Sequence, residues 1–112
     1  MMIEKIIYDY LSENLDAPVY MEQPDKKPKR YVVIEKLGGA KHSTINNSLM
    51  AVQSYAESMY ETASLNERVI DTVEGLINND DVNRVSLNTS YNFPDTEQKL
   101  YRYQAVFDIV HY

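Results

Sequence analysis

Apolar residues recur along the chain with two different periods, and the change of period divides the chain into helices and strands. Residues 2–15 carry apolar side chains at spacings of three and four, namely Ile3, Ile6, Ile7, Tyr10 and Leu11. This spacing places them on one face and predicts an amphipathic helix. Pro18 follows this segment. Because proline disfavours helix in the residue before it, the helix is expected to end near residue 15.

A short extended piece is expected at residues 19–22, before a polar turn, QPDKKPKR, at residues 23–30. The next segment, YVVIEKL at residues 31–37, is short and rich in β-branched residues, which predicts a strand. A pair of glycines is expected to stop it. The stretch AKHSTINN then shows no strong period, so we expect residues 38–47 to form a mobile loop. A loop of about ten residues is long for a compact domain and is often functional.

Residues 49–56 predict a second strand, after which the period becomes that of a helix. The strand is expected to turn Met50, Val52, Ser54 and Ala56 to one face, and Leu49, Ala51, Gln53 and Tyr55 to the other. Ser58 precedes Glu61 by three residues, the spacing of a helix-starting capping box. We therefore predict a second helix over residues 59–77, ended by the turn-forming sequence NNDD.

The last part of the chain has the pattern of an antiparallel hairpin. Residues 82–91 and 99–112 predict two strands, joined by a turn at residues 92–98 that contains Pro94 and Asp95. The first strand is expected to place four side chains on one face: Val85, Leu87, Thr89 and Tyr91. The second alternates Tyr101, Tyr103, Ala105, Phe107 and Ile109 against Arg102, Gln104 and Asp108.

These elements together predict an α+β fold with the order α-β-β-β-α-β-β. Strands linked by short turns favour a mainly antiparallel sheet, here of four to five strands, with both helices packed on one face. The chain has 112 residues, which fits a single domain over residues 1–112. The uncovered sheet face and the sheet edges are then available to water or to neighbouring proteins.

The composition of the chain limits which partners and which kinds of site can be expected. The net charge is −6, and a protein that grips duplex DNA normally needs a basic surface. Cysteine is absent, which excludes disulfides, zinc–thiolate sites and thiol nucleophiles. No apolar run has the roughly 18–20 residues of a membrane span, and the charged first segment argues against a signal peptide. Ten tyrosines suit half-covered sheet faces or subunit interfaces equally well.

Candidate catalytic groups are few. His42 and His111 have no metal-ligand spacing, and both are expected to be ordinary surface histidines. Asp80 and Asp81 form the only adjacent acidic pair, in a turn where aspartate is favoured for backbone reasons. A nuclease would need them to converge with a third carboxylate such as Asp95 on a metal ion. We expect no such convergence.

The sequence also lacks two common motifs of phosphate binding and of hydrolysis. The two glycines after residue 37 lack the following GK[ST] of a phosphate-binding loop, and no serine lies in a G-x-S-x-G elbow. The sequence therefore predicts no catalytic residues, no metal and no cofactor. One basic cluster, Lys26, Lys27, Lys29 and Arg30, has two readings. It is either a solvated turn that discourages edge-to-edge pairing or a contact with an acidic partner or DNA phosphate.

Several stretches resemble a family of small phage proteins. These stretches are RYVVIEKLGG, LMAVQSYAES followed by ASLNERV, and VSLNTSYNFPDTEQKLYRYQAVFDIVHY. They are similar to the tail terminator, or tail completion and head–tail joining, proteins of long-tailed phages and prophages, some of which are labelled minor capsid or minor tail proteins. The resemblance covers nearly the whole chain and carries no catalytic signature.

The resemblance implies a structural virion component rather than an enzyme. It implies a ring, usually of six copies, on the head-proximal end of the tail tube, assembled in the host cytoplasm and then held at the head–tail junction. Its partners would be further copies of itself, the tail-tube protein and the head–tail connector, with DNA only as passing cargo and no membrane. Two groups of residues are our candidates for contacts. The assembly-loop residues are Gly38, Gly39, Lys41, His42 and Asn46, and the partner-contact residues are Lys26, Lys27, Lys29, Arg30, Pro94 and Asp95.

Three alternatives stay open at the level of sequence. One is another neck protein, such as a head-side stopper or adaptor. A second is a non-viral binding module whose acidic surface imitates nucleic acid. A third is a small hydrolase or nuclease, which the motif search does not favour.

Overall fold

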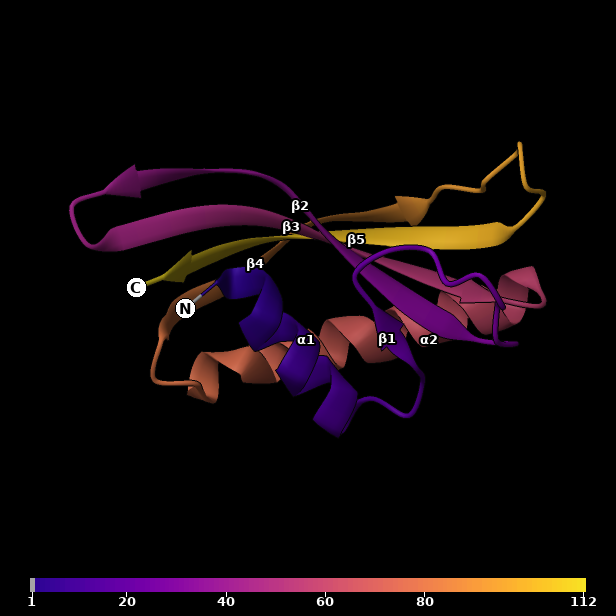
Figure 1. Cartoon of the computed structure of the whole chain (residues 1–112), viewed down its shortest axis with the longest axis horizontal. Helices are drawn as coiled ribbons and strands as arrows, with labels where there is room; N and C mark the ends of the chain where they lie inside the picture. Colours follow the sequence, from indigo (N-terminus) through magenta and orange to yellow (C-terminus); the bar gives the residue numbers. More distant parts are fainter. Residues whose placement is uncertain (1) are drawn as a thin grey trace.

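Two helices lie against one face of a five-stranded sheet (Figure 1). The computed structural model describes residues 2–112. In chain order the elements are α1 (Ile3–Asn14), β1 (Val19–Tyr20), β2 (Tyr31–His42), β3 (Ile45–Ala56), α2 (Met59–Glu74), the 3₁₀ turn η1 (Gly75–Asn78), β4 (Val82–Asn92) and β5 (Tyr101–His111). This is an α+β fold, and the order of elements predicted from the sequence is confirmed.

The sheet has the spatial order β1-β2-β3-β5-β4. The short β1 runs parallel to β2, and every other neighbouring pair is antiparallel. The central strands β3 and β5 pair in unbroken register from Asn46 opposite His111 to Ala56 opposite Tyr101. By contrast, β2 and β4 each shift register against their neighbours. A continuous pair of strands thus forms the middle of the sheet, with irregular strands on both sides.

The hydrophobic core lies between this sheet and the two helices. Helix α1 contributes Ile3, Ile6, Ile7 and Leu11, and α2 contributes Leu65, Val69, Ile70 and Val73. The sheet faces them with alternate residues of three strands: Val32, Ile34, Met50, Val52, Ala105, Phe107 and Ile109. The alternation predicted for the second and last strands is therefore confirmed, because each buries its expected apolar face.

Helix α2 begins as its sequence predicts and ends slightly earlier. The hydroxyl of Ser58 accepts a hydrogen bond from the backbone N–H of Glu61 at 3.1 Å, as expected for a capping residue. After Glu74 the chain tightens into η1, so the helix predicted over residues 59–77 changes type in its last turn. The hydroxyl of Tyr10 from α1 packs so closely over Gly75 that a Cβ atom there would collide with it.

The segment predicted as a mobile loop is instead a regular β-hairpin. Strand β2 continues to His42, and β3 begins at Ile45, so that residues 38–47 pair across a two-residue turn. Ser43 in this turn has a φ of 55°, the positive value that tight hairpin turns require. The hairpin lacks an apolar period because nearly all of its side chains face water, and backbone pairing does not depend on such a period.

The two glycines of this segment do not end the strand. Gly39 lies so close to β3 that a Cβ atom on it would sit 2.7 Å from the backbone oxygen of Asn47. Gly38 has open space around it and directly follows a register shift after Lys36. Gly39 therefore permits a close approach between two paired strands. The prediction that the two glycines end the strand is wrong.

A bulge in β4 corrects a second prediction. Val85 and Leu87 lie opposite core residues of β5, as expected. The register shifts between Leu87 and Thr89, so that Thr89 and Tyr91 lie on the opposite, helix-free face. One extra residue in a strand reverses the facing of every residue after it. The four side chains predicted to share a face are therefore split between two faces.

The helix-free face of the sheet carries a second, smaller apolar cluster. Tyr31 and Tyr55 stack with ring centroids 4.6 Å apart, and Tyr20 meets Tyr31 edge-on. The Tyr31 hydroxyl donates a hydrogen bond to Gln23 Oε1 at 2.9 Å, and burial raises the pKa of this phenol to about 12. Two of the ten tyrosines are thus internal packing residues, while Tyr60, at 82% exposed, faces water.

The contrast between the two glycines predicts opposite effects of the same substitution. Gly39→Ala should lower the free energy of unfolding by about 1–3 kcal/mol, because the new methyl group forces two backbones apart. Gly38→Ala should raise it by about 0.4–1 kcal/mol, because it restricts the unfolded chain and meets no obstacle. Urea denaturation of both variants measures the difference. Equal effects would contradict the close strand approach at residue 39.

Candidate functional site

In the described part of the chain, the adjacent acidic pair named from the sequence lies apart from Asp95. No group of three histidine, aspartate or glutamate side chains within residues 2–112 is arranged to hold a metal ion. Asp81 lies in a turn where its N–H donates to Asn79 Oδ1 at 2.8 Å, near the end of β5. Asp95 lies in the β4–β5 turn, at the other end of β5, where its carboxylate accepts from the N–H of Gln98. The structure therefore separates the carboxylates that a nuclease would have to combine.

His111 is not the surface residue that its position in the sequence suggests. It is 4% exposed, and its Nε2 lies within hydrogen-bond distance, 2.7 Å, of the buried Ser48 hydroxyl on β3. Burial lowers the pKa of the imidazole, so its neutral form is favoured. The reason is its strand position, since β5 stays paired with β3 as far as His111 itself. His42 is exposed, as predicted.

The first candidate interaction surface is the end of the β2–β3 hairpin, residues 36–47, which we call the tip hairpin. Figure 1 shows it extending past the end of the helix layer. All its residues are exposed except the half-buried Asn46. Leu37 and Ile45 are 46% and 43% exposed, so two large apolar side chains face water. The candidate residues Gly38, Gly39, Lys41, His42 and Asn46 all lie here.

Two lysines project from the helix side of the tip hairpin. Lys36 pairs with Met50 and Lys41 with Asn46, which places both on the sheet face that carries the helices. They border an open hollow of about 280 Å³ beside the two glycines. In the part of the chain that the structure describes, neither lysine forms an ion pair. The tip hairpin is therefore a preformed, positively charged ribbon.

The second candidate surface is an open groove of about 670 Å³ between α2 and β4. It exists because α2 covers β3 and β5, leaving the helix-side face of β4 beyond it largely uncovered. Ile70 and the 43%-exposed Leu87 supply apolar surface, and Glu67 lies on the helix wall. We call it the α2–β4 groove. Sequence analysis did not find it, because the groove depends on how far β4 lies from the helix.

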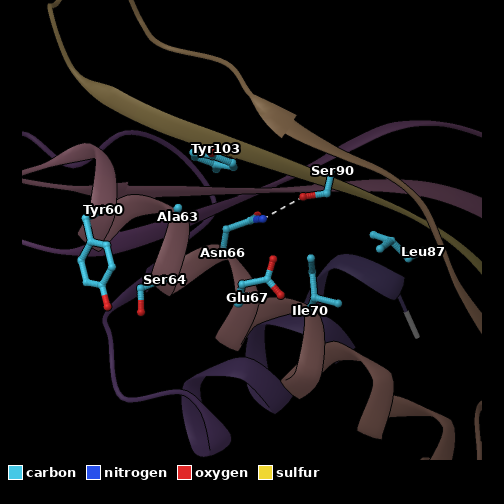
Figure 2. A pocket seen from close by; sticks show the side chains of 9 residues that line it. All are labelled: Tyr60, Ala63, Ser64, Asn66, Glu67, Ile70, Leu87, Ser90 and Tyr103. Atoms are coloured by element: carbon cyan, nitrogen blue, oxygen red, sulfur yellow. Dashed lines mark hydrogen bonds between the residues drawn. The ribbon is translucent and has the colours of Figure 1, made fainter.

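A single hydrogen bond spans the floor of this groove. Figure 2 shows the side-chain amide of Asn66 reaching from α2 to Ser90 on β4, with an Nδ2–Oγ distance of 2.8 Å. Asn66 is 1% exposed, yet its carbonyl oxygen has no hydrogen-bond partner within residues 2–112. A buried carbonyl without a partner is uncommon in folded proteins. The unpartnered oxygen is itself buried, so it lies beneath the surface of the groove.

The partner-contact candidates lie at the end of the sheet opposite the tip hairpin. Arg30 is engaged internally, since its guanidinium donates to the backbone oxygen of Asp16 at 3.0 Å. Lys27 and Lys29 border a hollow of about 360 Å³ that the β4–β5 turn also lines. Asp95 from that turn lines a second hollow together with Met21, Glu22 and Gln23, which directly follow β1. The structure therefore brings together the segments that contain Lys26, Lys27, Lys29, Arg30, Pro94 and Asp95.

Arg102 holds the β4–β5 turn against the sheet. Its guanidinium carbon lies 4.2 Å from the centre of the Phe93 ring, and its Nε donates to the Phe93 backbone oxygen at 2.6 Å. A second nitrogen donates to the Tyr55 hydroxyl at 3.3 Å, and another contact at 4.0 Å reaches the Asp95 carboxylate. One planar cation therefore joins the turn to the tyrosine cluster.

Negative charge is concentrated on the helix layer. Helix α1 carries three carboxylates and one lysine, and α2 carries four carboxylates and one arginine. On α2, Glu67, Asp71 and Glu74 follow one another at spacings of four and three, which lines them up along one exposed side. This acidic row borders the α2–β4 groove through Glu67. The chain is therefore electrically asymmetric, with an acidic helix layer and a basic tip hairpin.

Comparison with known proteins does not assign this chain to a family. No protein-family model matches it, and no curated protein sequence matches it. Among the described residues, no helix combines the length and apolar character needed to cross a membrane.

Burial of His111 predicts a specific acid sensitivity. The folded protein resists protonating this imidazole, whereas the unfolded chain takes up the proton near the ordinary pKa of 6.5. The free energy of unfolding should therefore fall as the pH drops from 7 towards 5. His111→Gln should remove this part of the pH dependence, measured by urea denaturation at several pH values. His42→Gln, which removes an exposed imidazole, is the matched control, and an unchanged slope in His111→Gln would contradict the assignment.

The Arg102 contacts predict that lysine cannot replace this residue. Arg102→Lys should lower the free energy of unfolding by about 1–2 kcal/mol, because an ammonium cannot keep both the ring stack and the forked hydrogen bonds. Amide hydrogen exchange in residues 93–100 should become faster, while exchange in the tip hairpin should not change. Arg84→Lys is the control, since Arg84 is exposed and makes no ion pair within the described chain. Equal effects of the two substitutions would rule out the proposed role.

Proposed function

We propose that this protein is a structural assembly subunit that closes the head-proximal end of a phage tail tube as a ring and joins the tail to the head. The observation that carries the proposal is the tip hairpin. It is regular structure that buries almost nothing of its own, yet it exposes Leu37 and Ile45. Exposed apolar side chains on an ordered element are typical of contact surfaces.

The molecule also offers two unlike surfaces, which is what a ring subunit requires. A closed ring is built from a head-to-tail contact, in which one patch of each copy meets a different patch of the next. The tip hairpin and the α2–β4 groove differ in shape and in charge. The stretches that resemble tail terminators cover residues 30–39, 49–58, 63–69 and 85–112, which include parts of β2, β3, α2 and β4 and the whole of β5. The resemblance therefore involves the first strand of the tip hairpin as far as Gly39, and most residues that line the groove.

The charge of the chain fits the same role. A terminator surrounds a channel through which DNA passes, and carboxylates facing that channel repel phosphate. The net charge of −6 and the acidic helix layer suit a subunit that must not hold DNA.

One observation favours a second candidate. Helices α1 and α2 together carry seven carboxylates against one lysine and one arginine, which also suits a binding module that imitates nucleic acid and captures a basic protein. The two functions differ in their partner. The mimic binds one basic protein tightly and has no need for the tip hairpin, whereas the ring subunit loses its function when the tip hairpin is changed. Gene deletion distinguishes a terminator from a stopper or adaptor of the same neck region.

Deleting the gene from the phage genome that encodes the protein tests the proposal. Electron microscopy of lysates should show overlong tails without heads, because nothing stops growth of the tube. Supplying the wild-type gene in trans should restore particles of normal length. Unattached tails of normal length would restrict the protein to the joining step, as for a stopper or adaptor. Intact, infectious particles would refute a role in the neck.

A further inference from the structure

We infer that the tip hairpin of one copy docks into the α2–β4 groove of a second copy of this chain. The inference rests on the proposed function for the closure of the ring, and it names the two surfaces that would form the ring contact. The contact itself requires only this chain. The two surfaces are complementary in charge and lie on different sides of the molecule.

Charge complementarity selects the partner. The tip hairpin presents Lys36 and Lys41 on one side, and neither has an acidic partner in the described part of its own chain. The acidic row of Glu67, Asp71 and Glu74 is exposed along α2, and none of its members forms an ion pair within residues 2–112. Two unpaired sets of opposite charge on the same chain are satisfied when copies meet hairpin to helix.

Apolar surface is matched as well. Leu37 and Ile45 are exposed on the tip hairpin, and Leu87 is exposed in the groove, which Ile70 also lines. Burying two such side chains of the hairpin removes apolar area from water on both copies. Docking a ribbon in the groove closes it off.

The contact must be between copies and not within one. The tip hairpin lies at one end of the sheet on β2 and β3, whereas the groove lies beside β4, across β5. No bending of a paired strand brings the two together. Because the surfaces are different, each copy uses its hairpin on one neighbour and its groove on the other, which produces a ring or an open chain.

Direct pairing of sheet edges is the less suitable contact. Both β2 and β4 carry register shifts, after Lys36 and after Leu87. Bulges interrupt the row of free backbone groups that a neighbouring strand would need, and natural proteins use them to block edge-to-edge association. The hairpin contributes side chains to the contact, and its edge does not extend the sheet of the next copy.

The absence of cysteine allows a direct test on the purified chain. Thr44→Cys places a thiol on the exposed turn of the tip hairpin, and Ser64→Cys places one on the exposed wall of the groove. The double variant, treated at high protein concentration with a short bismaleimide crosslinker, should give a ladder of multimers on a denaturing gel. Each single variant should give no species larger than a dimer. Thr44→Cys combined with Lys27→Cys, at the opposite end of the sheet, is the matched control pair.

Charge reversal in the same background tests the specificity. Lys36→Glu with Lys41→Glu should reduce the ladder about tenfold, because acidic side chains then face the acidic row. Adding Glu67→Lys and Asp71→Lys to the same chain should restore it. All four positions are exposed, and circular dichroism checks that each variant is folded. A ladder that survives the first reversal, or that is not restored by the second, would overturn the inference.

The outcome is independent of the phage experiment. If the double cysteine variant crosslinks no better than its control pair, the hairpin-to-groove contact is wrong, whatever the deleted phage produces. If the ladder forms while the deleted phage still makes intact particles, the contact stands and the role in the tail fails.

Discussion

The continuous register between β3 and β5 is the constraint on which the other features depend. These two strands share an unbroken ladder from one end of the sheet to the other, and their alternate residues supply the middle of the core. Both helices pack on the face that this ladder presents. The outer strands adapt to it, since β2 and β4 take up all the register shifts of the sheet within the described residues. The irregularities therefore lie at the edges.

The elements that could be predicted from the sequence are those whose buried side chains recur at a regular spacing. The stripe of α1 and the alternation of β5 both face the core, so their apolar residues recur regularly. The tip hairpin was missed because its strands are held by backbone pairing while their side chains face water. His111 was misplaced because burial at a strand end depends on its neighbour β3. The α2–β4 groove could not be predicted, since it arises from the spacing between two elements distant in sequence.

The two candidate contact regions lie at opposite ends of the sheet, with the acidic helix layer on one of its faces. At one end, within the described chain, the tip hairpin is held by its own backbone pairing and by β5 beside it. At the other end the tyrosine cluster, Arg102 and the two adjacent turns form a closely packed surface. The candidate contact residues predicted from the sequence lie in both regions, and their positions at opposite ends of the sheet could not be predicted. Their separation along the sheet leaves room for a different contact at each end.

The position of β5 in the chain also has a consequence for how the protein is made. It pairs along the whole of β3, but α2, η1 and β4 are synthesised between the two strands. Until β5 has been synthesised, one edge of β3 is unpaired, and Met50 and Val52 lack their strand partners Phe107 and Ala105. Pairing between segments so distant in sequence is slow. The central ladder of the sheet is therefore completed only after every other strand of the sheet has been made.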